Sequence, residues 1–200
     1  MTLASIIEKR INESSCGEVF IVSDFMDVAP YDTARKTLSR LCEDGLIKKI
    51  TRGMYYKAKF STLINEYVKP DMNLVANAFA RNFGWTIVPS GETAVNLLGL
   101  STQVVGRYNF ISSGPYRSYN IDGIIISFSH RMEKEFNGLS YKSRLIIQSI
   151  KAIGSEQIDK YIGSIRNKLS DEEKKTLLSE TQRTTTWVYE VIKKICKELN

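Results

Sequence analysis

Basic side chains are concentrated in one stretch of the 200-residue sequence, between Tyr31 and Phe60, which holds eight Lys or Arg against three Asp or Glu. Lysine and arginine grip phosphate oxygens, and arginine also reads guanine edges in the major groove. The residue types therefore indicate contact with double-stranded DNA. The candidate DNA-binding residues are Tyr31, Thr33, Arg35, Lys36, Ser39, Arg40, Lys49, Thr51, Arg52 and Lys57.

The first part of this stretch has the periodicity of an amphipathic helix. Ala34, Leu38 and Leu41 recur at i, i+4 and i+7, so they form one apolar stripe. At about 100° per residue, Lys36 and Ser39 fall almost opposite that stripe. We expect a recognition helix that packs on one face and presents hydrogen-bond donors to DNA on the other.

The second part predicts a basic β-hairpin. Residues 46–50 and 54–59 are rich in β-branched and aromatic types, and Gly53 supplies the positive φ that a tight turn needs. We expect Lys49, Arg52 and Lys57 to bind phosphates or to enter the adjacent minor groove. A solvated basic hairpin beside an ordinary amphipathic helix is the alternative, since charge runs alone do not distinguish the two.

The elements before this stretch complete a recognisable order. The pattern predicts a helix at residues 3–12, a strand at 18–22 and a short helix at 25–28. A winged helix-turn-helix domain has this order of helix, strand, helix, helix and hairpin. We place such a domain at residues 1–60.

Residues 61–200 form the second predicted domain. After a connector at 60–70, a helix is expected at 71–83, and strand-like runs follow at 85–89, 104–112 and 119–129. From Tyr141 onward the apolar spacing is helical. The fold class predicted for the whole chain is α+β: a winged helix-turn-helix, then a small, mostly antiparallel sheet with a helical C-terminal part.

Composition narrows the classes of protein further. The net charge of +6 favours an anionic partner. Cys16, Cys42 and Cys196 are odd in number and form no C-x-x-C pair, so we expect neither a zinc finger nor a disulfide framework. Without a signal-peptide pattern or an apolar run of about 20 residues, a cytoplasmic protein with no membrane partner is expected.

The sequence gives little support for a catalytic site. His130 is the single histidine, and the spacing does not favour a triad of Ser90, Asp122 and His130. A nuclease-like set of Asp122, Lys142 and the run 133–135 has its lysine misplaced. There is also no P-loop and no G-x-G-x-x-G. We therefore expect no enzyme activity, no cofactor and no metal.

Two features carry a family resemblance: the predicted winged helix, which ends in ITRGMYY at 50–56, and the segment WTIVPSGETAVNLLGLS at 85–101. The helical tail with TWVY at 186–189 is similar as well. With them the chain resembles the AbiEi-type antitoxins of bacterial type IV toxin–antitoxin systems. The resemblance implies a transcriptional regulator that represses its own operon. It also implies opposition to a cognate toxin with a nucleotidyltransferase-like fold, without a stable complex being required.

Two other functions stay open. One is a protein-interaction module that binds and blocks a toxin directly through the C-terminal helices. The other, less favoured, is an enzyme that acts on nucleic acid or nucleotides. Co-purification with the neighbouring gene product distinguishes the first of these from a DNA-binding regulator.

Overall fold

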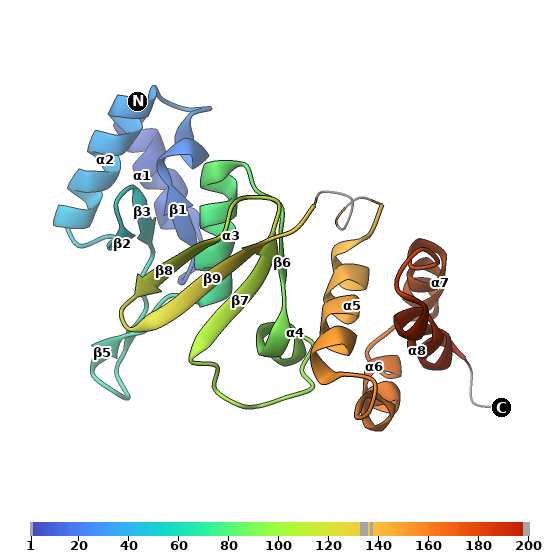
Figure 1. The fold of residues 1–200 in the computed structure, drawn as a ribbon. Coiled ribbons are helices and arrows are strands. Elements are labelled where there is room, and N and C mark those ends of the chain that lie inside the picture. The colour runs from blue at the N-terminus through green and yellow to red at the C-terminus, as the bar shows by residue number, and fades with distance from the viewer. Residues whose placement is uncertain (1, 133–135, 137, 198–200) are drawn as a thin grey trace. The chain divides into compact units, whose positions relative to one another are not determined.

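The computed structural model describes residues 2–132, 136 and 138–197 and divides into two compact units between Trp85 and Thr86 (Figure 1). We call residues 1–85 unit 1 and residues 86–200 unit 2. The division lies after helix α3 (Met72–Phe83) rather than at the predicted boundary after residue 60, because α3 packs against strand β1 (Val19–Ile21).

Unit 1 follows the predicted order of elements. They are α1 (Leu3–Glu13), β1, the 3-10 helix η1 (Val22–Phe25), α2 (Tyr31–Glu43), β2 (Lys48–Thr51) and β3 (Met54–Tyr56). The three strands form an antiparallel sheet in the order β1-β3-β2. The short helix predicted at 25–28 is wrong. The observed turn starts at Val22 because the Asp24 carboxylate accepts a 2.9 Å hydrogen bond from the Ile21 N–H and fixes the turn there.

The apolar stripe of α2 is confirmed as the face that packs. Ala34 and Leu38 are fully buried, and Leu41 is nearly so. They share a core with Ile7 and Ile11 of α1. Phe20, Phe25, Ile47 and Tyr55 close the same cluster. The sheet and α1 together therefore fix the orientation of α2 about its own axis.

The hairpin predicted after α2 is present, with a bulge. Lys49 pairs with Tyr55 and Thr51 with Met54, so the register shifts between Lys49 and Thr51. Gly53 has φ of 75°, as the turn requires. A bulge increases the local twist of the strand that carries it. The basic side chains of β2 are therefore not arranged in the simple alternation of a regular strand.

Residues 60–70, predicted to be a connector, contain a second small hairpin. Strands β4 (Phe60–Ser61) and β5 (Glu66–Tyr67) pair antiparallel, and the Phe60 and Tyr67 ring centroids are 5.2 Å apart. The two-residue strands are too short for an alternating pattern, which is why periodicity did not indicate them.

Unit 2 begins with a mixed α+β layer. Its elements are β6 (Ile87–Pro89), α4 (Gly91–Leu97), β7 (Arg107–Ser112), β8 (Arg117–Ile121) and β9 (Ile124–His130). The sheet order is β6-β7-β9-β8, with β7 and β9 parallel and the other pairs antiparallel. The predicted turn at Asp122-Gly123 is confirmed, with both residues at positive φ.

The C-terminal part of unit 2 is helical, as predicted. It contains α5 (Tyr141–Ile153), the 3-10 helix η3 (Ile158–Tyr161), α6 (Ile162–Arg166), α7 (Asp171–Glu180) and α8 (Thr186–Cys196). Fully buried Ile146, Ile150 and Ile192 contribute to one core with Ala94 of α4. Within the described ranges, no helix combines the length and apolar character needed to cross a bilayer.

Candidate nucleic-acid interface

Helix α2 presents polar side chains on the side that does not pack. Lys36 and Ser39 are exposed, and Tyr31 at the first position is 51% exposed. Arg35 and Arg40 are exposed as well, whereas Thr33 is half-buried. Since the opposite stripe is in the core, these side chains point into solvent from a helix that is held in place from behind.

The contacts of these side chains are long and solvent-exposed. Arg35 lies 3.6 Å from Asp32, and Arg40 lies 3.8 Å from Glu8. Lys36 forms no salt bridge with any residue that the structure describes. Exposed ion pairs contribute about 0–1 kcal/mol, so phosphates can replace them at little cost.

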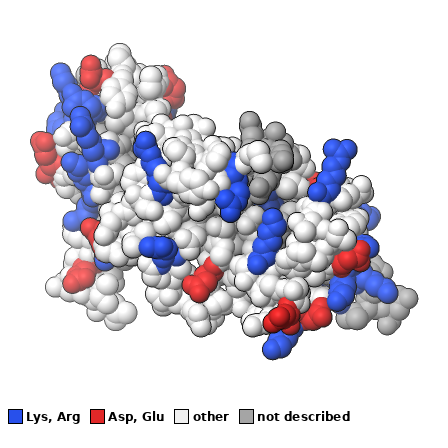
Figure 2. Space-filling view, viewed as in Figure 1, with Lys and Arg blue, Asp and Glu red and all other residues white. Residues whose placement is uncertain are grey.

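The β2–β3 hairpin adds two exposed cations close in sequence. Lys49 is exposed on β2, and Arg52 is exposed in the turn beside Gly53. Thr51 is half-buried at the end of β2. Figure 2 shows Lys and Arg side chains gathered over the part of unit 1 that contains α2, with acidic side chains at its edges.

Lys57 has a different environment from the other predicted residues. Its Nζ donates hydrogen bonds to the backbone carbonyls of Asn12, at 2.7 Å, and Ser14, at 2.8 Å. Because these carbonyls lie at the C-terminal end of α1, the ammonium group satisfies acceptors that the helix leaves open. The structure therefore places Lys57 in the framework of unit 1, apart from the exposed basic set.

Lys48 is a basic residue of the predicted hairpin that is not among the ten candidate DNA-binding residues. Its Nζ lies 3.7 Å from the centroid of the Tyr67 ring, which joins β2 to the β4–β5 hairpin by a cation–π contact. The sequence signal for this contact is the pair of aromatic residues, Phe60 and Tyr67, on either side of the short run 61–66. Such a pair can face across a small hairpin.

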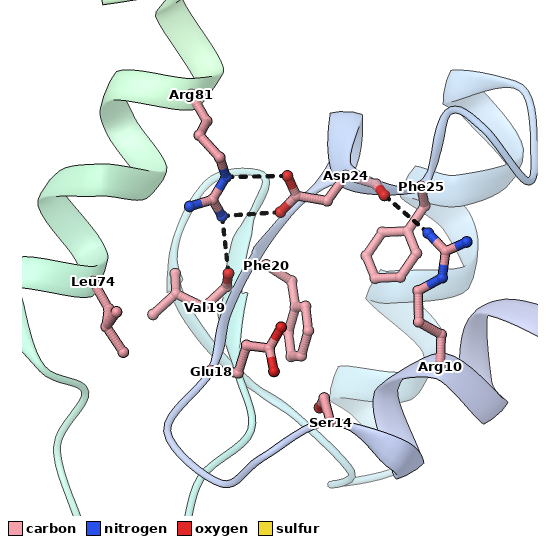
Figure 3. A pocket seen from close by; sticks show the side chains of 9 residues that line it. All are labelled: Arg10, Ser14, Glu18, Val19, Phe20, Asp24, Phe25, Leu74 and Arg81. Atoms are coloured by element: carbon pink, nitrogen blue, oxygen red, sulfur yellow. Dashed lines mark hydrogen bonds and ion pairs between the residues drawn. The ribbon is translucent and has the colours of Figure 1, made fainter. Parts of the chain in front are cut away.

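The framework behind the exposed set centres on Asp24. Its carboxylate accepts hydrogen bonds from Arg81 Nε at 3.2 Å and Nη2 at 3.1 Å, and Nη2 also donates to the Val19 carbonyl at 3.1 Å. Figure 3 shows these bonds at the edge of a hollow of about 510 Å³. Asp24 therefore ties α3 to β1 and η1.

Arg10 holds the other side of the same hollow. It donates two hydrogen bonds, of 3.0 and 2.7 Å, to the Asp27 carboxylate. It also donates one of 3.2 Å to the Asp24 carbonyl (Figure 3). The hydrogen bond from Arg10 lowers the pKa of Asp27 below its ordinary value, and the same bond raises the pKa of Arg10. Arg10 and Arg81 therefore both donate hydrogen bonds to acceptors within unit 1.

The residues considered for catalysis do not assemble. Asp122 precedes β9 and His130 ends it, which separates them by the length of a seven-residue strand, about 20 Å. His130 Nδ1 lies 2.9 Å from the Gly114 carbonyl. Ser90 precedes α4 as its N-cap residue. The nuclease-like residues Glu133 and Glu135 lie outside the described residues.

Among the described residues, no group of three His, Cys, Asp or Glu side chains is close enough to hold a metal ion.

Comparison with known proteins gives a family and a distant structural similarity. No curated protein matches the sequence. A crystal structure of the Rv2827c protein from Mycobacterium tuberculosis is similar over 98% of this chain and 76% of that chain, with a TM-score of 0.46 and 14% sequence identity. A family model matches residues 6–177. The chain belongs to DUF6088, a family of unknown function.

Proposed function

We propose that unit 1 is a winged helix-turn-helix module and that the protein is a DNA-binding antitoxin that represses its own operon. The observation that carries the DNA-binding part is the division of α2 into two faces. Ala34 and Leu38 have no exposed surface, while Lys36 and Arg40 lie in solvent beside a basic hairpin. A helix with this division is fixed from behind and free to enter a groove.

In the proposed binding mode, the two ends of α2 have different roles. The N-terminal half of α2, with Tyr31, Arg35 and Lys36, enters the major groove, and Ser39 and Arg40 follow along the same helix. Acidic Glu43 and Asp44 lie at the other end of α2, where they oppose DNA least.

The hairpin supplies contacts that do not depend on sequence. Lys49 and Arg52 bind phosphates of the adjacent backbone, and the half-buried Thr51 supports the turn. Phosphate contacts fix the register of the protein on the duplex, and base contacts from the helix give specificity. Lys57 is left out of this set because both of its acceptors belong to the end of α1.

The regulator part is tested by measuring binding of the full chain to the DNA upstream of its own gene and to scrambled DNA, across a salt series. We expect a clear preference for the upstream DNA. Arg52→Ala should weaken binding to both DNAs alike and reduce the salt slope by about one unit. If Arg52→Ala leaves both affinity and slope intact, the hairpin is not a wing.

The antitoxin part rests on the resemblance to AbiEi-type antitoxins. We propose that the chain counteracts a nucleotidyltransferase-like toxin encoded beside it. Co-expression of the two proteins should restore growth that the toxin alone suppresses. Separate migration of the two proteins in gel filtration supports opposition without a stable complex, whereas a stoichiometric complex favours direct blocking through the C-terminal helices.

A further inference from the structure

Unit 2 contains a hollow of about 940 Å³ that the proposed DNA-binding role does not use. Its lining comes from β7, residues 138–139, α5, the end of α7 and the segment that joins α7 to α8. Volumes of roughly 300–1,000 Å³ are typical of sites for small organic ligands. All of the lining residues belong to unit 2, so the hollow is a feature of that unit alone.

One wall of the hollow is a face of α5. Arg144, Gln148 and Lys151 are spaced i, i+4 and i+7, so they lie on the same side of the helix, and all three line the hollow. Arg183 lines it from the segment between α7 and α8. None of these cations forms a salt bridge with a residue that the structure describes.

Arg144 carries the most specific signal. Its Nε is buried and has no hydrogen-bond partner among the residues that the structure describes. A buried donor without an acceptor costs free energy, and the planar guanidinium is suited to two parallel bonds to one oxyanion. Arg144 also lines the hollow, so a ligand that brings oxygen atoms to this edge would meet its guanidinium group.

Glu180, an acidic residue of the lining, already accepts hydrogen bonds from the protein. Its Oε2 accepts a 2.9 Å hydrogen bond from the Ser140 N–H at the start of α5. Burial raises the pKa of Glu180, but hydrogen bonds from Ser143 and Ser140 and the nearby charge of Arg144 outweigh burial and leave the pKa lowered. Glu180 therefore stays ionised and stabilises α5. Among the described residues, three cations line the hollow against one anion.

The rest of the lining is partly apolar. Ile111, Leu139 and Ile147 contribute side chains that hold no charge. A ligand that matches both parts has an anionic end for the cations and a flat or apolar end for the aliphatic side chains. A nucleotide has this division, with phosphate at one end and a base at the other.

We propose that this hollow binds a phosphate group carried by a nucleotide, either free or at the 5′ end of a nucleic-acid strand. Arg144 and Arg183 bind the phosphate oxygens, Lys151 adds a point charge, and the base lies against Ile147 and Leu139. The site is independent of α2 and the hairpin, so it extends the function beyond operator binding.

Calorimetric titration of the full chain tests the site with three probes: ATP, and a short single-stranded RNA with and without a 5′ phosphate. We expect saturable binding of at least one phosphate-bearing probe. Binding of ATP identifies the free nucleotide as the ligand. Binding of the RNA alone, and only when it is phosphorylated, identifies the strand end.

Variants decide whether the binding occurs in this hollow. Lys151 and Arg183 are exposed, so Lys151→Gln and Arg183→Gln should fold normally. Each should weaken binding about tenfold, since each removes one charge-assisted contact. Lys160→Gln is the matched control, because Lys160 is an exposed lysine of η3 outside the lining, and its affinity should stay within about twofold of the parent.

Two results would overturn the proposal: no binding of any phosphate-bearing probe, or equal binding by the parent and the Lys151→Gln/Arg183→Gln double variant. The same variants should bind upstream DNA like the parent protein. Operator binding and nucleotide binding can therefore fail separately, and the failure of one leaves the other standing.

Discussion

Unit 1 uses the same residue types in two opposite ways. On the side built by α1, η1 and α3, Arg10 and Arg81 each reach a carboxylate with two hydrogen bonds and a carbonyl with one more. On the side built by α2 and the β2–β3 hairpin, Lys36 and Arg52 lie in solvent. The number of acceptors around a cation, rather than its place in a charge run, distinguishes the residues that hold unit 1 together from those that we propose bind DNA.

The difference also has an energetic meaning. Cations with several short contacts contribute to folding and are costly to remove. Cations that lie in water contribute little to folding and are available to a partner. Substitutions on the two sides should therefore separate stability from DNA affinity, and the experiments below follow the expected size of the effect.

The largest effect is expected where the two sides meet, in the core beneath α2. Leu38→Ala removes a fully buried side chain and leaves a cavity, which should lower the free energy of unfolding by about 2–5 kcal/mol. Urea unfolding followed by circular dichroism measures it. Ser39→Ala, the next residue but exposed, is the control and should change the free energy of unfolding by less than about 0.5 kcal/mol. Equal effects for the two would mean that α2 does not pack as described.

The next effect concerns affinity instead of stability. Lys36→Ala should weaken binding to upstream DNA by about 1–3 kcal/mol if Lys36 reads a base, with the free energy of unfolding almost unchanged. Fluorescence anisotropy at fixed salt measures the affinity. Lys160→Ala changes the net charge equally from unit 2 and should have a smaller effect. A loss of the same size in both variants would reduce the role of Lys36 to net charge alone.

The sequence was sufficient to predict the strong periodic elements. The stripe of Ala34, Leu38 and Leu41 fixed which face of α2 is buried, and Gly53 fixed the turn of the hairpin. Both signals are local, since each depends only on residues within a few positions of one another. The predicted DNA contacts of the exposed residues stay predictions.

The contacts between distant segments could not be predicted in this way. Lys57 looked like a wing residue, yet its acceptors lie at residues 12 and 14. The partner of Asp24 is Arg81, on a helix that the sequence assigned to another domain. The short η1 turn also depends on Asp24, through a capping bond that periodicity does not encode. Pairings of this kind depend on the tertiary fold, which a local pattern does not contain.

The Asp24 contact gives the third prediction. Arg81→Ala removes both bonds to Asp24 and the bond to the Val19 carbonyl. Because both side chains are partly exposed, we expect a loss of about 1–2 kcal/mol in the free energy of unfolding. Lys69→Ala, an exposed lysine of the same unit, should have almost no effect. If Arg81→Ala were as stable as the parent protein, α3 would not depend on this contact for its place in unit 1.

The smallest effect decides the role of Lys57. Lys57→Met keeps most of the aliphatic stem and removes the ammonium group that caps the end of α1, which should cost about 1 kcal/mol of unfolding free energy. DNA affinity should stay within about twofold of the parent protein. Lys59→Met is the matched control, since Lys59 is exposed two residues along the chain and should leave stability unchanged. The opposite outcome would be unchanged stability with weakened DNA binding and a reduced salt slope. It would mean that Lys57 belongs to the DNA-binding hairpin and that the DNA-binding surface extends past β3.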